Sequence, residues 1–168
     1  MRPQISRILL VAAIAGLVLA SPAGARPVFD GKVCGLLTAK QIATVPGLSP
    51  ACTNARPTKG FGSTMYVGNW PGNTPTSPIL QVTIARYADS GALQLAKRNL
   101  RQGLPGGPPR KVPGVGAGAY EANGASSVGI HFTVGGYVGY VSLNTRGTAS
   151  RALEAALETL AKAVAARL

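Results

Sequence analysis

A run of basic side chains between Asp89 and Glu121 has the residue types and spacing that most favour a chemical role. No acidic residue lies between these two positions. Uncancelled positive charge raises the local electrostatic potential, so the run predicts a binding site for an anion. The alternative is a solvated helix face followed by a flexible loop, which needs no ligand. The residues of this predicted site are Lys97, Arg98, Arg101, Arg110 and Lys111.

The two cysteines, Cys34 and Cys52, are the next candidates for chemistry. In an oxidising compartment such a pair favours a disulfide, which would close a loop of about 18 residues. The alternative is zinc, which needs four protein ligands or three and a water. Only one histidine, His131, accompanies the two cysteines, and it lies far away in the sequence. We therefore predict a covalent link and no metal site.

His131 alternates with Ile130 and Phe132 in a strand-like pattern, so its side chain points away from theirs. Nucleophilic catalysis would require a serine or cysteine beside it and a carboxylate to orient it. We predict no catalytic residue and no cofactor. The alternative is a cell-envelope hydrolase that uses His131 with a carboxylate. A glycosidase-type pair of Asp89 and Glu121 is also conceivable, but no motif supports it.

Aromatic side chains offer a second type of binding surface. A sheet face lined by aromatic rings could bind carbohydrate or lipid, whereas core or cross-strand packing is the simpler interpretation. The residues concerned are Tyr66, Trp70, Tyr137 and Tyr140. The glycine-rich stretch 114–119 does not predict a phosphate loop, because its glycine spacing is wrong and a strand follows it.

The first 25 residues have the pattern of a cleavable secretory signal. Arg2 and Arg7 precede the uncharged run Ile8–Ala20, and Pro22 precedes an Ala-x-Ala sequence that ends at Ala25. The apolar run is shorter than the roughly 20 residues that span a bilayer. The residues before Cys34 do not fit a lipoprotein cleavage site. We expect one secreted domain, residues 26–168, with no stable membrane span.

The formal net charge of +12 makes anionic partners attractive. Export makes nucleic acid the least expected of them, so we predict an anionic or lipidic envelope component, or an envelope protein. The sequence carries no signal for a particular oligomeric state.

Hydrophobic periodicity predicts an α+β domain. The pattern favours an antiparallel twisted sheet of about five strands, with helices packed mainly on one face, in the order α-β-β-α-β-β-β-α. The expected helices span residues 38–45, 90–102 and 148–168. The expected strands span residues 63–70, 79–87, 119–122, 126–134 and 136–144.

Several of these segments together resemble a known family. They are the opening Cys34-Gly-Leu-Leu-Thr, Cys52, the glycine-rich stretch 112–120, a glycine-centred hairpin and a C-terminal helix. The chain thereby resembles small actinobacterial cell-envelope domains of unknown function, and is similar in outline to extracellular sensor domains of mycobacterial serine/threonine kinases. The resemblance implies an α+β domain with a Cys34–Cys52 bond and no established activity.

The combined expectation is an exported, non-enzymatic binding or sensor-like module. It would lie in the periplasm or cell envelope, or be secreted, after cleavage near Ala25. Its ligand would be an anionic or lipidic envelope component, or a partner protein.

Overall fold

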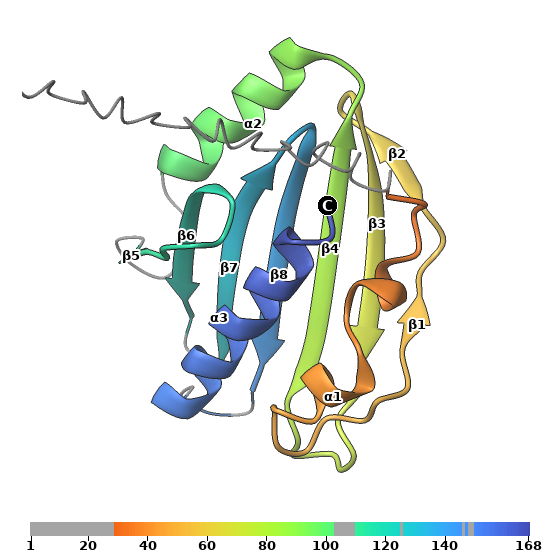
Figure 1. Ribbon diagram of the computed structural model, residues 1–168, viewed down its shortest axis with the longest axis vertical. Coiled ribbons are helices and arrows are strands. Elements are labelled where there is room, and N and C mark those ends of the chain that lie inside the picture. The colour runs from red at the N-terminus through yellow and green to blue at the C-terminus, as the bar shows by residue number, and fades with distance from the viewer. Residues whose placement is uncertain (1–28, 103–109, 125, 146, 148–149) are drawn as a thin grey trace, which may run out of the picture.

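The computed structural model describes residues 29–102, 110–124, 126–145, 147 and 150–168. The predicted signal segment, Met1–Ala25, lies outside these residues. One antiparallel sheet forms the centre of the molecule, with helices against it (Figure 1).

The sheet has eight strands, in the spatial order β1-β3-β4-β8-β7-β6-β5, and β2 pairs with β3. All the pairings are antiparallel. The strands are β1 (Thr53–Asn54), β2 (Thr58–Gly60), β3 (Ser63–Trp70), β4 (Ile79–Tyr87), β5 (Arg110–Lys111), β6 (Ala117–Asn123), β7 (Ser127–Val134) and β8 (Tyr137–Asn144).

The antiparallel α+β class is confirmed, but the predicted count of about five strands is wrong. The expected order likewise omits β1, β2 and β5. These strands have only two or three residues. Such short segments leave no alternating pattern in a sequence, because alternation needs at least four residues to be recognised.

The helical segments are η1 (Val33–Leu36), α1 (Ala39–Ile42), α2 (Ser90–Gln102) and α3 (Arg151–Ala165). Thr38 and Gln41 form the expected capping box at α1. Asp89 caps α2, since its carboxylate accepts the backbone N–H of Ala92 at 2.7 Å. Of the helices in the described ranges, none combines the length and apolar character needed to cross a bilayer.

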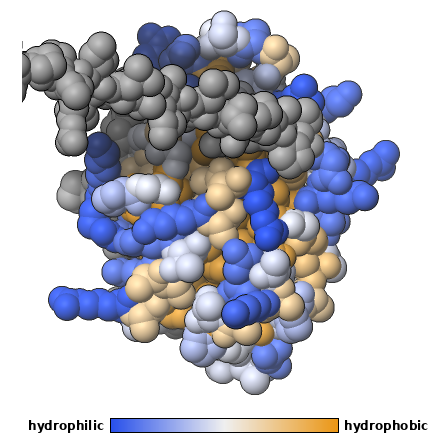
Figure 2. Space-filling model, in the orientation of Figure 1, coloured by the Kyte–Doolittle hydropathy of each residue, from blue (hydrophilic) through white to orange (hydrophobic). Residues whose placement is uncertain are grey.

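The core lies between one sheet face and α3, η1 and α1. Side chains on this face alternate along β7 and β8, and Val128, Ile130 and Phe132 are fully buried. Gly139 opposite Phe132 makes room for the ring, because a Cβ there would lie 2.2 Å from Phe132 Cζ. Figure 2 shows tan and pale residues mixed with hydrophilic side chains on the side of the molecule where α3 lies.

The opposite face carries α2 over one end of the sheet. Thr133 points away from Phe132, and it lies beside Gln94, Lys97 and Leu100 of α2. The helices therefore divide between the two faces, with α1 and α3 on one and α2 on the other. We call the face that carries α2 the second face, and its side chains point away from the core between the sheet and α3.

Cys34 and Cys52 form the expected link, with their sulfur atoms 1.97 Å apart and their Cα atoms 5.7 Å apart. The loop that they close contains α1 and all of η1 except Val33. Ile42, Val45 and Leu48 of this loop are buried in the core. A disulfide at this place is compatible with an extracellular location.

We expect that replacing both cysteines by alanine lowers the free energy of unfolding by about 3 kcal/mol, because an 18-residue loop is then open in the unfolded chain. Urea denaturation measures the difference. Reductant should destabilise the wild-type protein and leave the double variant unchanged. Equal stability of the two oxidised proteins would contradict this role.

Candidate functional site

Arg110, one of the five predicted binding residues, is already paired within the protein. Its Nε donates to Glu121 Oε2 at 2.5 Å, and its Nη2 donates to Glu158 Oε1 at 2.8 Å. The hydrogen bonds to Glu158 and Glu121 raise the pKa of the guanidinium above its ordinary value. Two carboxylates offset this cation, so it contributes little free positive potential.

The remaining predicted residues are not gathered with Arg110. Neighbouring residues of a strand point to opposite faces, so Arg110 faces α3 and Lys111 faces the other side. Arg98 and Lys111 are exposed, and Lys97 is half-buried on α2. The side chain of Arg101 lies outside the described residues. Lys97, Arg98, Arg101 and Lys111 stay a predicted anion site.

His131 lies on the second face of the sheet, stacked on Tyr140 with the ring centroids 3.9 Å apart. Burial lowers the pKa of its imidazole from 6.5 to about 4, because the charged form loses hydration. Tyr140 also leans over Gly129, where a Cβ would lie 2.4 Å from Tyr140 Cε2. His131 is thus a neutral, packed ring at physiological pH.

Four of the five acidic side chains in the chain have other structural roles than binding His131. Glu121 and Glu158 bind Arg110 on the α3 side of the sheet, and Asp89 caps α2. Asp30 accepts the backbone N–H of Lys32. The sheet itself separates Glu121 from the histidine. The suggested Asp89–Glu121 pair is not formed, because Asp89 caps α2 and Glu121 binds Arg110.

The four aromatic residues do not form one surface. Trp70 is buried in the core. Tyr66 and Tyr137 pack on the core side, where both rings meet the ring of Phe29 edge-on at centroid distances of 5.3 and 5.9 Å. Tyr140 lies on the other face with His131. Core and cross-strand packing thus account for these rings.

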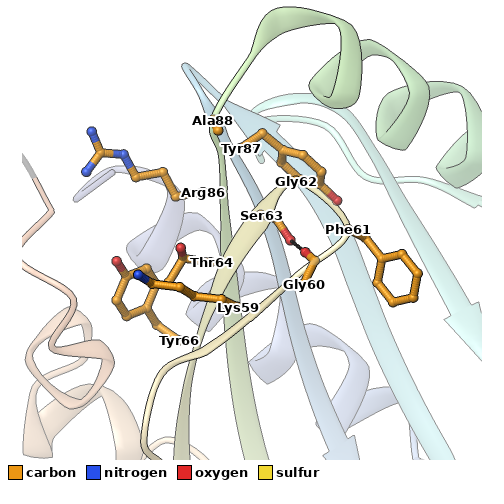
Figure 3. A pocket seen from close by; sticks show the side chains of 10 residues that line it. All are labelled: Lys59, Gly60, Phe61, Gly62, Ser63, Thr64, Tyr66, Arg86, Tyr87 and Ala88. Atoms are coloured by element: carbon orange, nitrogen blue, oxygen red, sulfur yellow. Dashed lines mark hydrogen bonds between the residues drawn. The ribbon is translucent and has the colours of Figure 1, made fainter.

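A hollow of about 510 Å³ lies at the end of the sheet where β2, β3 and β4 meet, and it contains a row of polar side chains (Figure 3). Lys59 pairs with Thr64, and Thr64 pairs with Arg86, so the three residues are consecutive cross-strand neighbours. Such neighbours have Cβ atoms about 5 Å apart. The register therefore places a hydroxyl between two cations.

Tyr66 completes the polar wall of this hollow. Figure 3 shows its ring on the same side of the hairpin as Lys59 and Thr64. Phe29 supports the ring, and Gly31 leaves space for it, because a Cβ on Gly31 would lie 2.8 Å from Tyr66 Cε1. The phenol is thereby held in place beside the Lys59–Thr64–Arg86 row.

The charge in the hollow is not offset by a salt bridge. Within the described ranges, no carboxylate lies within ion-pair distance of Lys59 or Arg86. Both side chains are exposed, whereas Thr64 is half-buried. The nearest acids in sequence, Asp30 and Asp89, bind Lys32 and the α2 N-terminus. Two cations and two hydroxyls thus surround a space that suits an oxygen-rich anion.

Sequence reasoning missed Lys59, Thr64 and Arg86 as a set. The strands that carry Thr64 and Arg86 were expected, but the pattern did not fix their register, and β2 was not expected at all. Gly62 was the available signal, since type I′ hairpin turns favour glycine at their second position, but Phe61 before it is not a residue that such turns favour. Among the described residues, no group of three or more His, Cys, Asp or Glu could hold a metal ion.

We expect Arg110→Met to destabilise the fold by about 3 kcal/mol, because it leaves the buried Glu121 carboxylate without its cationic partner. Glu121 is 2% exposed, and its Oε1 already lacks a hydrogen-bond partner among the described residues. The double variant Arg110→Met/Glu121→Met should recover most of the loss in urea denaturation. Lys111→Met is the matched control, within about 0.5 kcal/mol of wild type. Equal losses of stability in Arg110→Met and Lys111→Met would contradict this account.

Stability should fall between about pH 6.5 and pH 4 because of His131. The unfolded chain takes up a proton below 6.5, while the folded protein resists protonation until about 4. The loss across this window is at most about 3 kcal/mol. His131→Phe keeps a ring against Tyr140 and removes the titration. Urea denaturation should show a smaller pH dependence for the variant, and identical profiles would contradict the assignment.

Comparison with known protein families, curated proteins and solved structures found no match for this chain.

Proposed function

We propose that this chain is an exported, non-enzymatic binding module of the bacterial cell envelope that captures an anionic group in the hollow between β2, β3 and β4. The observation that carries the proposal is the cross-strand row Lys59–Thr64–Arg86, whose two cations have no carboxylate partner in the described part of the chain. The anion belongs to the phosphate or carboxylate class.

The spacing of the row supports an anion between the cations. Lys59 and Arg86 are separated by one strand, so their backbones lie roughly 10 Å apart, and long side chains can reach a common centre. Like charges at this separation repel one another in the empty site. An anion converts that repulsion into two charge-assisted contacts, to which the hydroxyls of Thr64 and Tyr66 add donors.

The wider charge distribution favours the same ligand class. The full chain has a formal net charge of +12, of which Arg2 and Arg7 of the expected signal supply two, and the charge that remains attracts polyanions within about a Debye length. The expected export signal directs the protein to a compartment with anionic lipids and acidic wall polymers. The arrangement of the acids disfavours the hydrolase alternative, because Glu121 and Glu158 are bound to Arg110 on the side of the sheet away from His131.

Glycerol phosphate is a simple probe of this site, and isothermal titration calorimetry measures its affinity. We expect Lys59→Gln/Arg86→Gln to weaken binding by at least tenfold, since a hydrogen bond to a charged group contributes about 1.5–3 kcal/mol. Rising salt should weaken binding to the wild type.

The matched control is Lys97→Gln/Arg98→Gln, which removes the same charge from α2. It should change the affinity by less than about twofold. A larger loss in this control than in the hollow variant would place the site on the second face and overturn the proposal. Equal small losses in both would mean diffuse attraction without a built site, which also overturns it.

A further inference from the structure

The two-residue turn between β2 and β3 places a phenylalanine at the tip of a hairpin. Gly60 pairs with Ser63, so Phe61 and Gly62 alone form the turn. Both have positive φ, 50° and 71°, as a type I′ turn requires. Asparagine, aspartate and glycine are the residues that this turn favours at its first position, and a bulky side chain there is strained. Turn formation therefore does not account for Phe61.

Among the described residues, none buries the ring of Phe61. Its relative exposure is 103%, the highest among the exposed large hydrophobic residues. Figure 3 shows the ring on the opposite side of the hairpin from Lys59 and Arg86. A strained residue whose apolar side chain is fully in water favours a role outside the folded monomer.

Two further exposed hydrophobic residues lie at the same end of the molecule. Met65 and Leu95 are 38% and 53% exposed. A Cβ on Gly62 would lie 3.4 Å from Ala92 Cβ, which places the first turn of α2 against the hairpin tip. Leu95 follows Ala92 by three residues, about one helical turn. Figure 1 shows α2 and the β2–β3 turn at the same end of the sheet.

Basic residues lie at the same end of the molecule as this apolar tip. Lys59 and Arg86 lie on one side of the hairpin, and Arg98 follows Leu95 by one turn of α2. A protruding apolar side chain within a basic surface has the features of a segment that binds an anionic membrane surface. A stable protein partner would need about 800 Å² of surface on each side, which a single protruding side chain does not supply.

We propose that the β2–β3 tip inserts Phe61 into the surface of an anionic lipid bilayer, with lipid phosphates occupying the Lys59–Thr64–Arg86 row. This inference deepens the proposed function and rests on it, since it names the lipid head group as the source of the anion. Met65 and Leu95 would then contact the acyl boundary beside the tip.

Co-sedimentation of the secreted chain with lipid vesicles tests the inference. Vesicles of phosphatidylcholine mixed with phosphatidylglycerol should bind the protein, and pure phosphatidylcholine should not. Phe61→Asn suits the type I′ turn, so it removes the ring without unfolding the hairpin. We expect it to weaken partitioning about tenfold, as the loss of one partly buried phenylalanine predicts. Ile79→Thr, which changes an exposed hydrophobic residue at the other end of β4, should have no effect.

Insertion has its own spectroscopic signature. Phe61→Trp should show a blue-shifted emission with phosphatidylglycerol vesicles, while the buried Trp70 gives a constant background. Vesicle binding that is unchanged in Phe61→Asn, or an emission of the Phe61→Trp variant that does not shift, would overturn the insertion.

The outcomes separate this inference from the proposed function. Binding of glycerol phosphate without vesicle binding overturns the membrane inference alone and points to a soluble or polymeric anion. Failure of both probes overturns both. Equal binding to neutral and anionic vesicles overturns the role of Lys59 and Arg86 in membrane binding. In that case, a glycerol phosphate affinity that depends on these two residues would still support the proposed anion site in the hollow.

Discussion

The antiparallel register of β3 with β2 and β4 is the constraint on which both faces of this molecule depend. In an antiparallel sheet, directly paired residues share a face, so each pairing fixes the direction of two side chains at once. The Thr64 pairings therefore bring Lys59 and Arg86 to one side. The same rule, carried through β8 and β7, turns His131 to the opposite side. A slip of one residue between β3 and β4 would send Arg86 to the second face and would also expose Ile84. Core burial and the arrangement of the hollow are thus protected by the same pairings.

The edges of the sheet are stabilised by different interactions from those of its centre. At one edge, the Cys34–Cys52 link holds η1 and α1 against the core and ends beside β1. At the other edge, β5 has only two residues and little apolar surface, and Arg110 joins it to Glu121 of β6 and Glu158 of α3. A buried ion pair adds little stability compared with apolar packing, but it penalises arrangements that leave Glu121 without its partner. In this chain it also removes Arg110 from the cations that a ligand can use.

Much of the central fold could be predicted from the sequence because its signals are local. The alternation in β3, β4, β7 and β8 and the leucine spacing of α3 place these elements correctly, and the Thr38–Gln41 capping box is formed. The short strands β1, β2 and β5 depend on neighbours that are distant in sequence, so no local pattern predicts them. The same reason explains the candidate site. The basic run of residues 97–111 is conspicuous in the sequence, yet pairing with two distant carboxylates offsets Arg110. Lys59 and Arg86 are 27 positions apart in the numbering, and only the strand register brings them together.

The position of α2 connects the two basic regions of the molecule. Because α2 begins at the β2–β3 turn and crosses the end of the sheet toward β6, its Lys97 and Arg98 lie on one side of that end, and Lys59 and Arg86 lie on the other. Charges on both sides of a protruding tip produce a positive potential that is directed outward along the sheet axis. A flat anionic surface approached along this axis would meet both groups together, whereas a small soluble anion would select the group with the better hydrogen-bond donors. The hydroxyls of Thr64 and Tyr66 lie at the hollow, so under the proposed function the hollow would recognise the anion and α2 would contribute long-range attraction.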